Sequence, residues 1–236
     1  MIANNTERKE KTLWTENPEG EKIHFRQFMN GYEEAEFVVG DIARRHREGT
    51  AEYHNCAVLY RTNAQSRLFE EKFIVSNIPY KIVGGVNFYA RKEIKDLLAY
   101  LKTIDNARDD LAVRRIINVP KRGIGATTLN RVADYAAAAD ISFYNALKMA
   151  DDIPTLGKSA AKIKPFVNFI QVMRSKVEII SVSELLQEII DETGYVKELE
   201  AEDTEEAKAR IENIDELISK VVAYEEGEEL SLIHIS

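Results

Sequence analysis

Residues 118–128 read Asn-Val-Pro-Lys-Arg-Gly-Ile-Gly-Ala-Thr-Thr and combine residue types that can bind an anion. Gly123 and Gly125 lack a Cβ, so a rigid ligand can approach the backbone closely. A helical pattern begins directly after them, and the free N–H groups of a first helical turn favour an anion. Positive charge and hydroxyl donors come from Lys121, Arg122, Thr127 and Thr128. Together these groups suit a phosphate of a nucleic-acid backbone, bound without any reading of the bases.

The same residues also fit a second interpretation, a helix–turn–helix corner that binds no ligand. Gly-x-Gly is a weak signal by itself, because two helices can need glycines only to turn the chain. The local residues favour neither interpretation over the other. A second stretch, residues 154–161, faintly repeats the pattern of proline, glycine and small residues and predicts a second corner of the helix-hairpin-helix kind.

The distribution of charge leaves nucleic acid open as a partner. The net charge of −8 argues against a DNA-binding protein only if it is spread evenly. Residues 176–229 carry 5 Lys and Arg against 18 Asp and Glu, whereas the rest of the chain carries 27 basic and 22 acidic residues. A local basic patch decides whether phosphates are attracted, because charges act over a Debye length of about 10 Å.

Arg61 and Asn63 form a second candidate site. They follow residues 56–60, a continuous apolar run typical of a strand buried on both faces. In parallel sheets ligands bind beyond the carboxyl ends of the strands, so Arg61 could hold a phosphate and Asn63 a base edge or sugar. The alternatives are a surface ion pair for Arg61 and a helix cap for Asn63. Phe88 and Tyr89 could stack on bases or simply pack between sheet and helix.

Strand and helix patterns alternate in the first hundred residues. The predicted strands are residues 23–29, 56–60 and 80–83, and the predicted helices are residues 33–47, 65–76 and 92–104. This alternation implies βαβ units and a parallel sheet. Gly84 and Gly85 follow the third strand, so we expect them at the same edge as Arg61.

From about residue 106 to 226 the sequence predicts helices and turns without a strand. Ser181 with Glu184 forms a capping box at one helix start, and Gly194 ends that helix. We therefore expect an α/β first part and an all-α second part that contains the glycine turn, with a boundary near residues 104–110.

The composition is that of a soluble globular protein, with 44% hydrophobic and 31% charged residues. No apolar run approaches the roughly 18 to 20 residues of a membrane span, and no signal peptide opens the chain. Cys56 is the only cysteine, so neither an intrachain disulfide nor a zinc cluster is expected. These features predict a cytoplasmic protein that does not bind membranes.

Several stretches, in their order and spacing, together resemble the UvrD/PcrA-type superfamily 1 DNA helicases from residue 1 to about 226. They are residues 13–17, 57–67, 78–80, 83–85, 88–89, 91–96 and 118–125. Members of this family are ATP-driven motors that move 3′ to 5′ along single-stranded DNA and separate the duplex. The resemblance implies a partial RecA-like domain, 2A, over residues 1–104 and part of the inserted helical domain, 2B, over residues 105–229.

The resemblance also implies DNA contacts at residues already singled out. The family's single-strand contacts fall on Arg61 and Asn63. Its glycine motif, which touches the duplex backbone, falls on Lys121, Gly123, Gly125, Thr127 and Thr128. Single-stranded and duplex DNA are therefore the expected partners.

The family's ATP-binding motifs do not occur in this sequence. There is no Gly-x-x-x-x-Gly-Lys-Ser/Thr loop, no apolar strand ending in Asp-Glu and no Gln-Asn-Tyr-Arg motif. Phosphoryl transfer depends on a positioned lysine, Mg²⁺ ligands and arginines. A full-length enzyme would use ATP and Mg²⁺, whereas we expect this chain alone to bind neither and to contain no catalytic, cofactor or metal site.

The sequence leaves three functions open. The first is part of an ATP-dependent DNA helicase, cut at both ends. The second is a stand-alone DNA-binding or regulatory module without a motor, and the third is part of a helicase–nuclease of the RecB or AddA kind. Residues 1–11 show no helix cap, and residues 230–236 look like the translation of a sequencing adaptor. Both features favour truncation and therefore the first function.

Overall fold

The computed structural model of the chain describes residues 14–16 and 18–227. The regular elements in these ranges are helices, and none of the described residues forms a β-strand. The expected α/β class with a partial RecA-like parallel sheet is therefore wrong. The α-helices of the described residues are α1 (Gly31–Arg47), α2 (Ser66–Val75), α3 (Lys92–Asp105), α4 (Asp110–Ile116), α5 (Ala126–Ala139), α6 (Phe143–Lys148), α7 (Ala160–Lys176), α8 (Val182–Thr193), α9 (Tyr195–Glu202) and α10 (Glu205–Glu225).

The three predicted strands do not pair with one another. Residues 23–29, 56–60 and 80–83 share no backbone hydrogen bond within the described part of the chain. Cys56 is extended, with φ −101° and ψ 139°, so the local β preference of its segment is expressed. An extended segment becomes a strand only through hydrogen bonds to a neighbouring segment, and those partners are not formed here.

Neighbouring side chains cover residues 56–60 and 80–83 on one side only, whereas residues 23–27 are exposed throughout. Val58 packs partly buried against the apolar side chains between α1 and α2. Leu59, the next residue, is 94% exposed, and Val83 is 86% exposed. A continuous apolar run forms a strand that is buried on both faces only where helices cover both faces of the sheet. The alternating exposure of these neighbours shows that this condition is not met among the described residues.

The predicted helices are confirmed, and local signals define their ends. Asn30 caps α1, because its Oδ1 accepts the Glu33 N–H at 2.9 Å. Ser181 and Glu184 form the predicted capping box at the start of α8. Gly194 ends α8 with φ +69°, a left-handed conformation that suits a residue without a Cβ.

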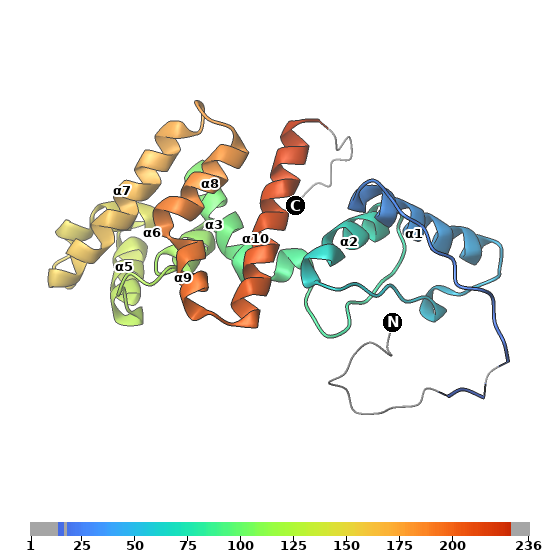
Figure 1. Cartoon of the computed structure of the whole chain (residues 1–236). Helices are drawn as coiled ribbons and strands as arrows, with labels where there is room; N and C mark the ends of the chain where they lie inside the picture. Colours follow the sequence, from blue (N-terminus) through green and yellow to red (C-terminus); the bar gives the residue numbers. More distant parts are fainter. Residues whose placement is uncertain (1–13, 17, 228–236) are drawn as a thin grey trace.

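Buried apolar side chains form two separate clusters. The larger one extends across α3 to α10, and we call residues 88–225 the helical unit. The smaller one lies between α1 and α2 in residues 18–87, the N-terminal unit, and consists of Ala35, Val39, Phe69 and Ile78. The two units lie end to end in an elongated molecule, with α10 next to the N-terminal unit (Figure 1).

Helix α3 packs within the helical unit, where it contacts α4, α7, α8 and α10. The division into two domains with a boundary near residues 104–110 stays a prediction. The expected tail at residues 230–236 lies outside the described residues. Among the described helices, none is both long and apolar enough to span a membrane.

Leu59→Ser and Ile78→Ala test this arrangement, because the strand prediction and the structure place Leu59 differently. Leu59 is exposed, so its change should alter the free energy of unfolding by less than about 0.5 kcal/mol. Ile78 is buried, and its change should lower that free energy by about 2 to 4 kcal/mol through lost packing. Urea unfolding followed by circular dichroism measures both. Equal losses for the two variants would contradict the open face.

Candidate nucleic-acid interface

The glycine turn joins α4 to α5 and is anchored by one apolar side chain. Ile124 is 2% exposed and packs in the helical unit, whereas Gly123 and Gly125 on either side of it are exposed. Gly123 has φ +69°, which L side chains rarely adopt. Asn118 Oδ1 accepts the backbone N–H groups of Arg122 at 2.8 Å and Ile124 at 3.2 Å. The first half of the turn is therefore fixed from inside the protein.

The Arg122 side chain points into the protein, not towards solvent. Its Nη2 donates to Tyr100 Oη at 2.6 Å, and Tyr100 Oη donates to the Val119 carbonyl at 2.5 Å. Burial raises the pKa of Tyr100, so its hydroxyl keeps the proton that it donates. Arg122 Nη1 donates at 3.0 to 3.3 Å to four carbonyl oxygens, those of Ile116, Ile117, Val119 and Pro120. This arginine therefore satisfies the end of α4 and is not available to a ligand.

The second half of the turn offers backbone donors to solvent. The N–H groups of Thr128 and Leu129 donate to the Gly125 carbonyl at 3.0 and 3.2 Å. The N–H groups of Ala126 and Thr127 have no acceptor among the described residues. No heavy atom lies within 4 Å of the place where a Cβ on Gly125 would stand. Two amides at the positive end of α5 are therefore open to an anion.

The side chains beside these amides are mostly accessible. Lys121 and Thr127 are exposed, and Thr128 is half-buried. Lys121 makes no ion pair with any described residue. The structure thus brings the predicted turn residues together on one exposed corner: Lys121, Gly123, Gly125, Thr127 and Thr128. Their role in binding DNA stays a prediction.

Lys162 is a residue of this corner that the sequence reasoning missed. It lies near the start of α7, and its Nζ donates to the Gly123 carbonyl at 3.2 Å. Arg131 Nη1 donates to the Thr155 carbonyl at 2.6 Å, which connects α5 to the second predicted corner. That corner contains Gly157 with φ +50°. Its faint sequence similarity to the first corner was the available signal, because α7 and Lys162 follow it directly.

Two further arginines near the turn are already engaged. Arg115 Nε pairs with the buried Asp96 carboxylate at 2.7 Å. The Arg114 guanidinium lies over the Phe143 ring, 5.1 Å from its centroid. They contribute to the local charge, but they are held by α3 and α6 and are less free than Lys121 to follow a phosphate.

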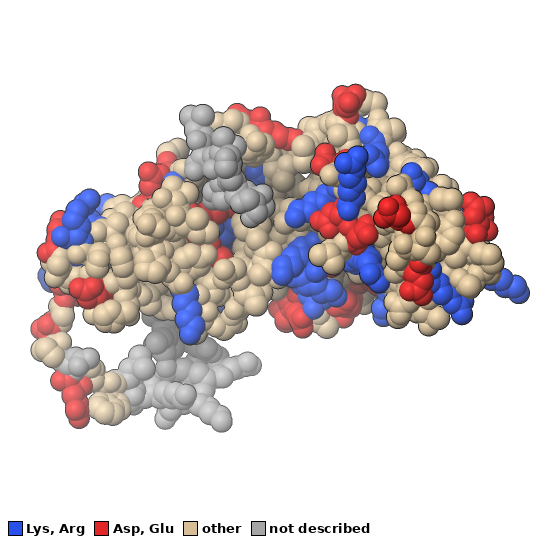
Figure 2. All heavy atoms as spheres, turned by 180° about the vertical axis from the view of Figure 1, so that it is seen from behind, with Lys and Arg blue, Asp and Glu red and all other residues tan. Residues whose placement is uncertain are grey.

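Charges of both signs surround the turn. Lys and Arg gather over the helical unit on the face opposite to that of Figure 1, with Asp and Glu between them (Figure 2). A cleft of about 290 Å³ beside the turn is lined by the cations Lys92, Lys121 and Arg210 and by the carboxylates Glu198 and Glu202 of α9. Lys162, whose Nζ donates to the Gly123 carbonyl, adds an exposed cation from α7. The carboxylates of α9 are therefore offset by neighbouring cations, and the cleft is not acidic as a whole.

Arg61 and Asn63 lie on the N-terminal unit, apart from the glycine turn. Both side chains are exposed, and the Arg61 guanidinium makes no ion pair with any described residue. Gln65 Oε1 accepts the backbone N–H groups of Arg61 at 2.9 Å and Thr62 at 3.1 Å. Thr62 is the N-cap of the short 3₁₀ turn η3 (Asn63–Gln65). The structure therefore supports neither the surface ion pair for Arg61 nor the cap for Asn63.

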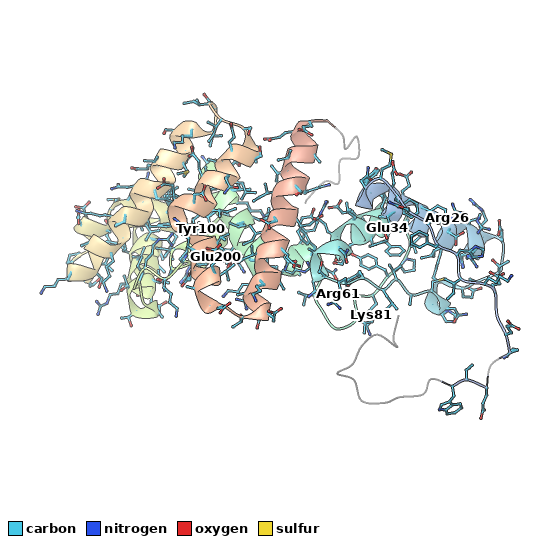
Figure 3. All side chains as sticks on the ribbon, in the orientation of Figure 1. Arg26, Glu34, Arg61, Lys81, Tyr100 and Glu200 are labelled. Atoms are coloured by element: carbon cyan, nitrogen blue, oxygen red, sulfur yellow. The ribbon has the colours of Figure 1, made fainter. Side chains whose placement is uncertain are left out.

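Gly85 and Lys81 border the Arg61–Asn63 corner. A Cβ on Gly85 would stand 3.9 Å from Asn63 Oδ1, so the predicted neighbourhood of these segments is present without a sheet. Arg61 and Lys81 project from the same lower edge of the N-terminal unit (Figure 3). Lys81 is exposed and is a second cation that the sequence reasoning did not assign to the site.

Phe88 and Tyr89 pack instead of presenting their rings to solvent. Phe88 is fully buried in the larger cluster and meets the Tyr89 ring edge-on, with 5.2 Å between centroids. Tyr89 Oη donates to Glu71 Oε1 at 2.9 Å. Phe88 therefore packs, but among helices and not between a sheet and a helix, and Tyr89 has its hydroxyl engaged.

Comparison with known proteins gives one consistent result. The profile of a protein family described as UvrD-like helicase C-terminal domain matches residues 1–235. The chain is 47% identical over 237 aligned positions to the ATP-dependent DNA helicase PcrA of Staphylococcus aureus strain Mu50, covering 99% of this chain and 32% of that protein. It is 44% identical over 229 positions to PcrA of Bacillus subtilis strain 168, covering 97% and 31%. The chain thus spans about a third of the length of these relatives.

Arg122→Lys and Lys121→Ala compare the contributions of the two basic residues of the turn to stability. Arg122 points into the protein, and Lys121 points to solvent. An ammonium group cannot donate at once to four carbonyls and to Tyr100, so Arg122→Lys should lower the free energy of unfolding by about 2 kcal/mol. Lys121 is exposed, and Lys121→Ala should change it by less than about 0.5 kcal/mol. Urea unfolding compares the two. A loss for Lys121→Ala as large as that for Arg122→Lys would contradict these assignments.

Proposed function

The chain belongs to the UvrD-like helicase C-terminal domain family, and from this premise we propose that it is the DNA-holding part of an ATP-dependent 3′–5′ DNA helicase. In this proposal the helical unit binds duplex DNA through the glycine turn. The N-terminal unit binds single-stranded DNA at the Arg61–Asn63 corner. The observation that carries the proposal is the exposed pair of unused amides at the start of α5, beside Lys121 and Lys162.

The chemistry of the turn suits a phosphate and not a base. Backbone N–H groups and an ammonium group are donors only, and a phosphate oxygen is an acceptor only. The exposed backbone amides belong to no side chain that could enter a groove and read a base edge. Gly125 lets the sugar-phosphate backbone approach the protein backbone closely, because no heavy atom lies within 4 Å of the place of its missing Cβ, whereas Lys162 Nζ lies 3.5 Å from that place at Gly123. Binding by this turn is therefore independent of DNA sequence.

The Arg61–Asn63 corner suits a single strand. Arg61 and Lys81 offer two exposed cations on one edge, and Asn63 offers both a donor and an acceptor. Basic side chains that follow the backbone are the common feature of sequence-independent single-strand sites. The buried Phe88 takes no part, so we assign no stacking platform to this corner.

ATP and Mg²⁺ belong to the proposed full-length helicase, and we assign neither of them to the described residues of this chain. The described residues contain no group of three or more His, Cys, Asp or Glu side chains that could hold a metal ion. The sequence contains no Gly-x-x-x-x-Gly-Lys loop to hold a triphosphate. We therefore assign no ATP or magnesium contact to this chain, and its proposed part is to hold DNA.

Lys121→Ala tests the phosphate contact at the turn. Removing one phosphate contact should make the slope of log K against log salt concentration less negative by about 0.9. The loss of affinity should be the same for duplexes of different sequence, because a phosphate carries no sequence information. Fluorescence anisotropy with several labelled 20-base-pair duplexes measures both quantities. Lys22→Ala, an exposed lysine of the N-terminal unit, is the matched control. A loss confined to some sequences would refute the phosphate role.

Arg61→Ala tests the single-strand corner. We expect weaker binding of a labelled single-stranded oligonucleotide and unchanged binding of blunt duplex, because the duplex contact lies on the other unit. Anisotropy titrations at one salt concentration compare the two ligands. Arg47→Ala, which removes an exposed arginine from the last turn of α1, serves as the control. If Arg61→Ala and Arg47→Ala weaken single-strand binding equally, the effect is one of net charge and the site is not at Arg61.

A further inference from the structure

The cleft beside the glycine turn has an apolar floor and a charged rim. It lies between Lys92 at the start of α3, residues 118–121, α9 and Arg210 of α10, and we call it the turn cleft. Its volume of about 290 Å³ is close to the lower limit of ligand pockets, which hold roughly 300 to 1,000 Å³. The turn cleft therefore has room for one small group and not for a folded segment of a partner.

Apolar side chains form the floor of the turn cleft. Tyr195 and Leu199 of α9 are each 6% exposed, and Val119 and Pro120 of the turn are half-buried. Contact with such a floor removes apolar surface of a ligand from water, which is favourable. The floor therefore favours a ligand that has an apolar face.

Hydrogen bonds behind the floor fix the walls of the cleft. Tyr195 Oη donates to the buried Asp96 carboxylate at 2.8 Å. Arg115 pairs with the same carboxylate at 2.7 Å and donates to the Lys92 carbonyl at 3.2 Å. Arg122 holds the wall formed by the turn through the carbonyls described above. The turn cleft is thus preformed, so binding does not have to order it.

Three charged groups of the rim have no charged partner in the described part of the chain. Lys92, Lys121 and Glu198 are exposed and make no ion pair there. Glu202 and Arg210 offset each other, with 3.9 Å between Oε2 and Nη1. The free cations come from α3 and the turn, whereas the free carboxylate comes from α9. The rim therefore suits a ligand with a negative group at one end and a hydrogen-bond donor at the other.

A nucleotide carries all of these features in one small unit. Its phosphate oxygens are acceptors, which suits the ammonium groups of Lys92 and Lys121. Its base has an apolar face for the floor and a polar edge. An ionised Glu198 offers acceptors only, so it suits the amino group of cytosine, adenine or guanine. Thymine lacks an amino group and presents a carbonyl oxygen, which a carboxylate repels.

The position of the turn cleft favours a nucleotide over a peptide of mixed charge. Lys121 lines the cleft and also stands beside the open amides at the start of α5, the proposed contact of the DNA backbone. A peptide has no counterpart for that adjoining phosphate contact. A base of the bound DNA reaches the cleft only after leaving the stack, because pairing and stacking cover it within a duplex.

We propose that the turn cleft binds one unstacked nucleotide whose base carries an amino group. Glu198 accepts that amino group, the floor contacts the face of the base, and Lys92 and Lys121 attract the phosphate. The nucleotide belongs to a DNA bound at the turn or is a free monophosphate, because the two share this chemistry. The DNA source rests on the proposed function, whereas the free nucleotide does not.

Glu198→Gln tests the contact with the amino group. A glutamine side chain has a similar shape but offers both an acceptor and a donor, so it suits the thymine carbonyl as well as an amino group. The variant should therefore lose the preference against thymine. The matched control is Glu200→Gln, which replaces an exposed carboxylate of the same helix that does not line the cleft (Figure 3). Circular dichroism checks that both variants keep their helix content.

The first measurement uses free nucleotides and needs no DNA. Deoxycytidine monophosphate should shift the backbone amide NMR signals of Lys121 and of residues 195–202 until they saturate. Thymidine monophosphate should bind about 5-fold more weakly, because it cannot donate to Glu198. Glu198→Gln should bring the two dissociation constants together, whereas Glu200→Gln should keep them apart.

The second measurement uses labelled duplexes that differ at one position: a bulged cytosine, a bulged thymine, or no bulge. Fluorescence anisotropy should show that the parent chain and Glu200→Gln bind the cytosine bulge about 5-fold more tightly than the thymine bulge. Glu198→Gln should bind the two bulged duplexes alike. The fully paired duplex should bind equally to all three proteins, because none of its bases is unstacked.

The two measurements together identify the source of the nucleotide. A cytosine preference with the bulged duplexes supports the site and assigns the nucleotide to DNA, and a preference with the free nucleotides alone supports the site and assigns it to a free monophosphate. No cytosine preference in either measurement, or one that Glu198→Gln leaves unchanged, would overturn the proposal. If the parent chain binds no duplex, the proposed function fails, and the titration with free nucleotides still decides what the cleft binds.

Discussion

The glycine turn can expose backbone amides because its inward-facing amides and the carbonyls at the end of α4 are paired from inside. A loop that leaves N–H groups open to solvent must still satisfy the carbonyls and amides that face the protein. Asn118 and Arg122 do this, the first for two amides and the second for four carbonyl oxygens. Ile124 adds an apolar anchor. The outward half of the turn is thus presented on a support that does not need a ligand to be stable.

The helices could be predicted from the sequence because their signals are local. Caps such as Asn30 and the Ser181–Glu184 box act within one turn, and apolar spacing at 3.6 residues needs only a neighbouring helix. Local signals could not show whether a sheet forms. An apolar run such as residues 56–60 reports a preference for extended backbone, but a strand needs a partner from elsewhere in the chain. Leu59 is exposed because that partner and a second covering layer are not formed.

The same distinction between local and distant signals applies to the candidate site. The grouping of Gly123, Gly125 and Thr127 on one corner could be predicted from the sequence, because residues at a helix start are consecutive in the chain. The direction in which Arg122 points could not be found, because it depends on Tyr100 and on the end of α4. Lys162 comes from another helix altogether. A basic residue next to a glycine turn is therefore a weak guide to charge at the site until its partners are known.

The acidic excess of residues 176–229 gains a structural meaning from α10. Part of that charge is neutralised where α10 meets the N-terminal unit, because Glu216 pairs there with Arg67 of α2. Another part, on α9, borders the cleft beside the turn, where Lys92, Lys121 and Arg210 offset it. Charges of both signs thus border the proposed phosphate contact at the turn, so its strength depends on these neighbours and not on the net charge of the chain.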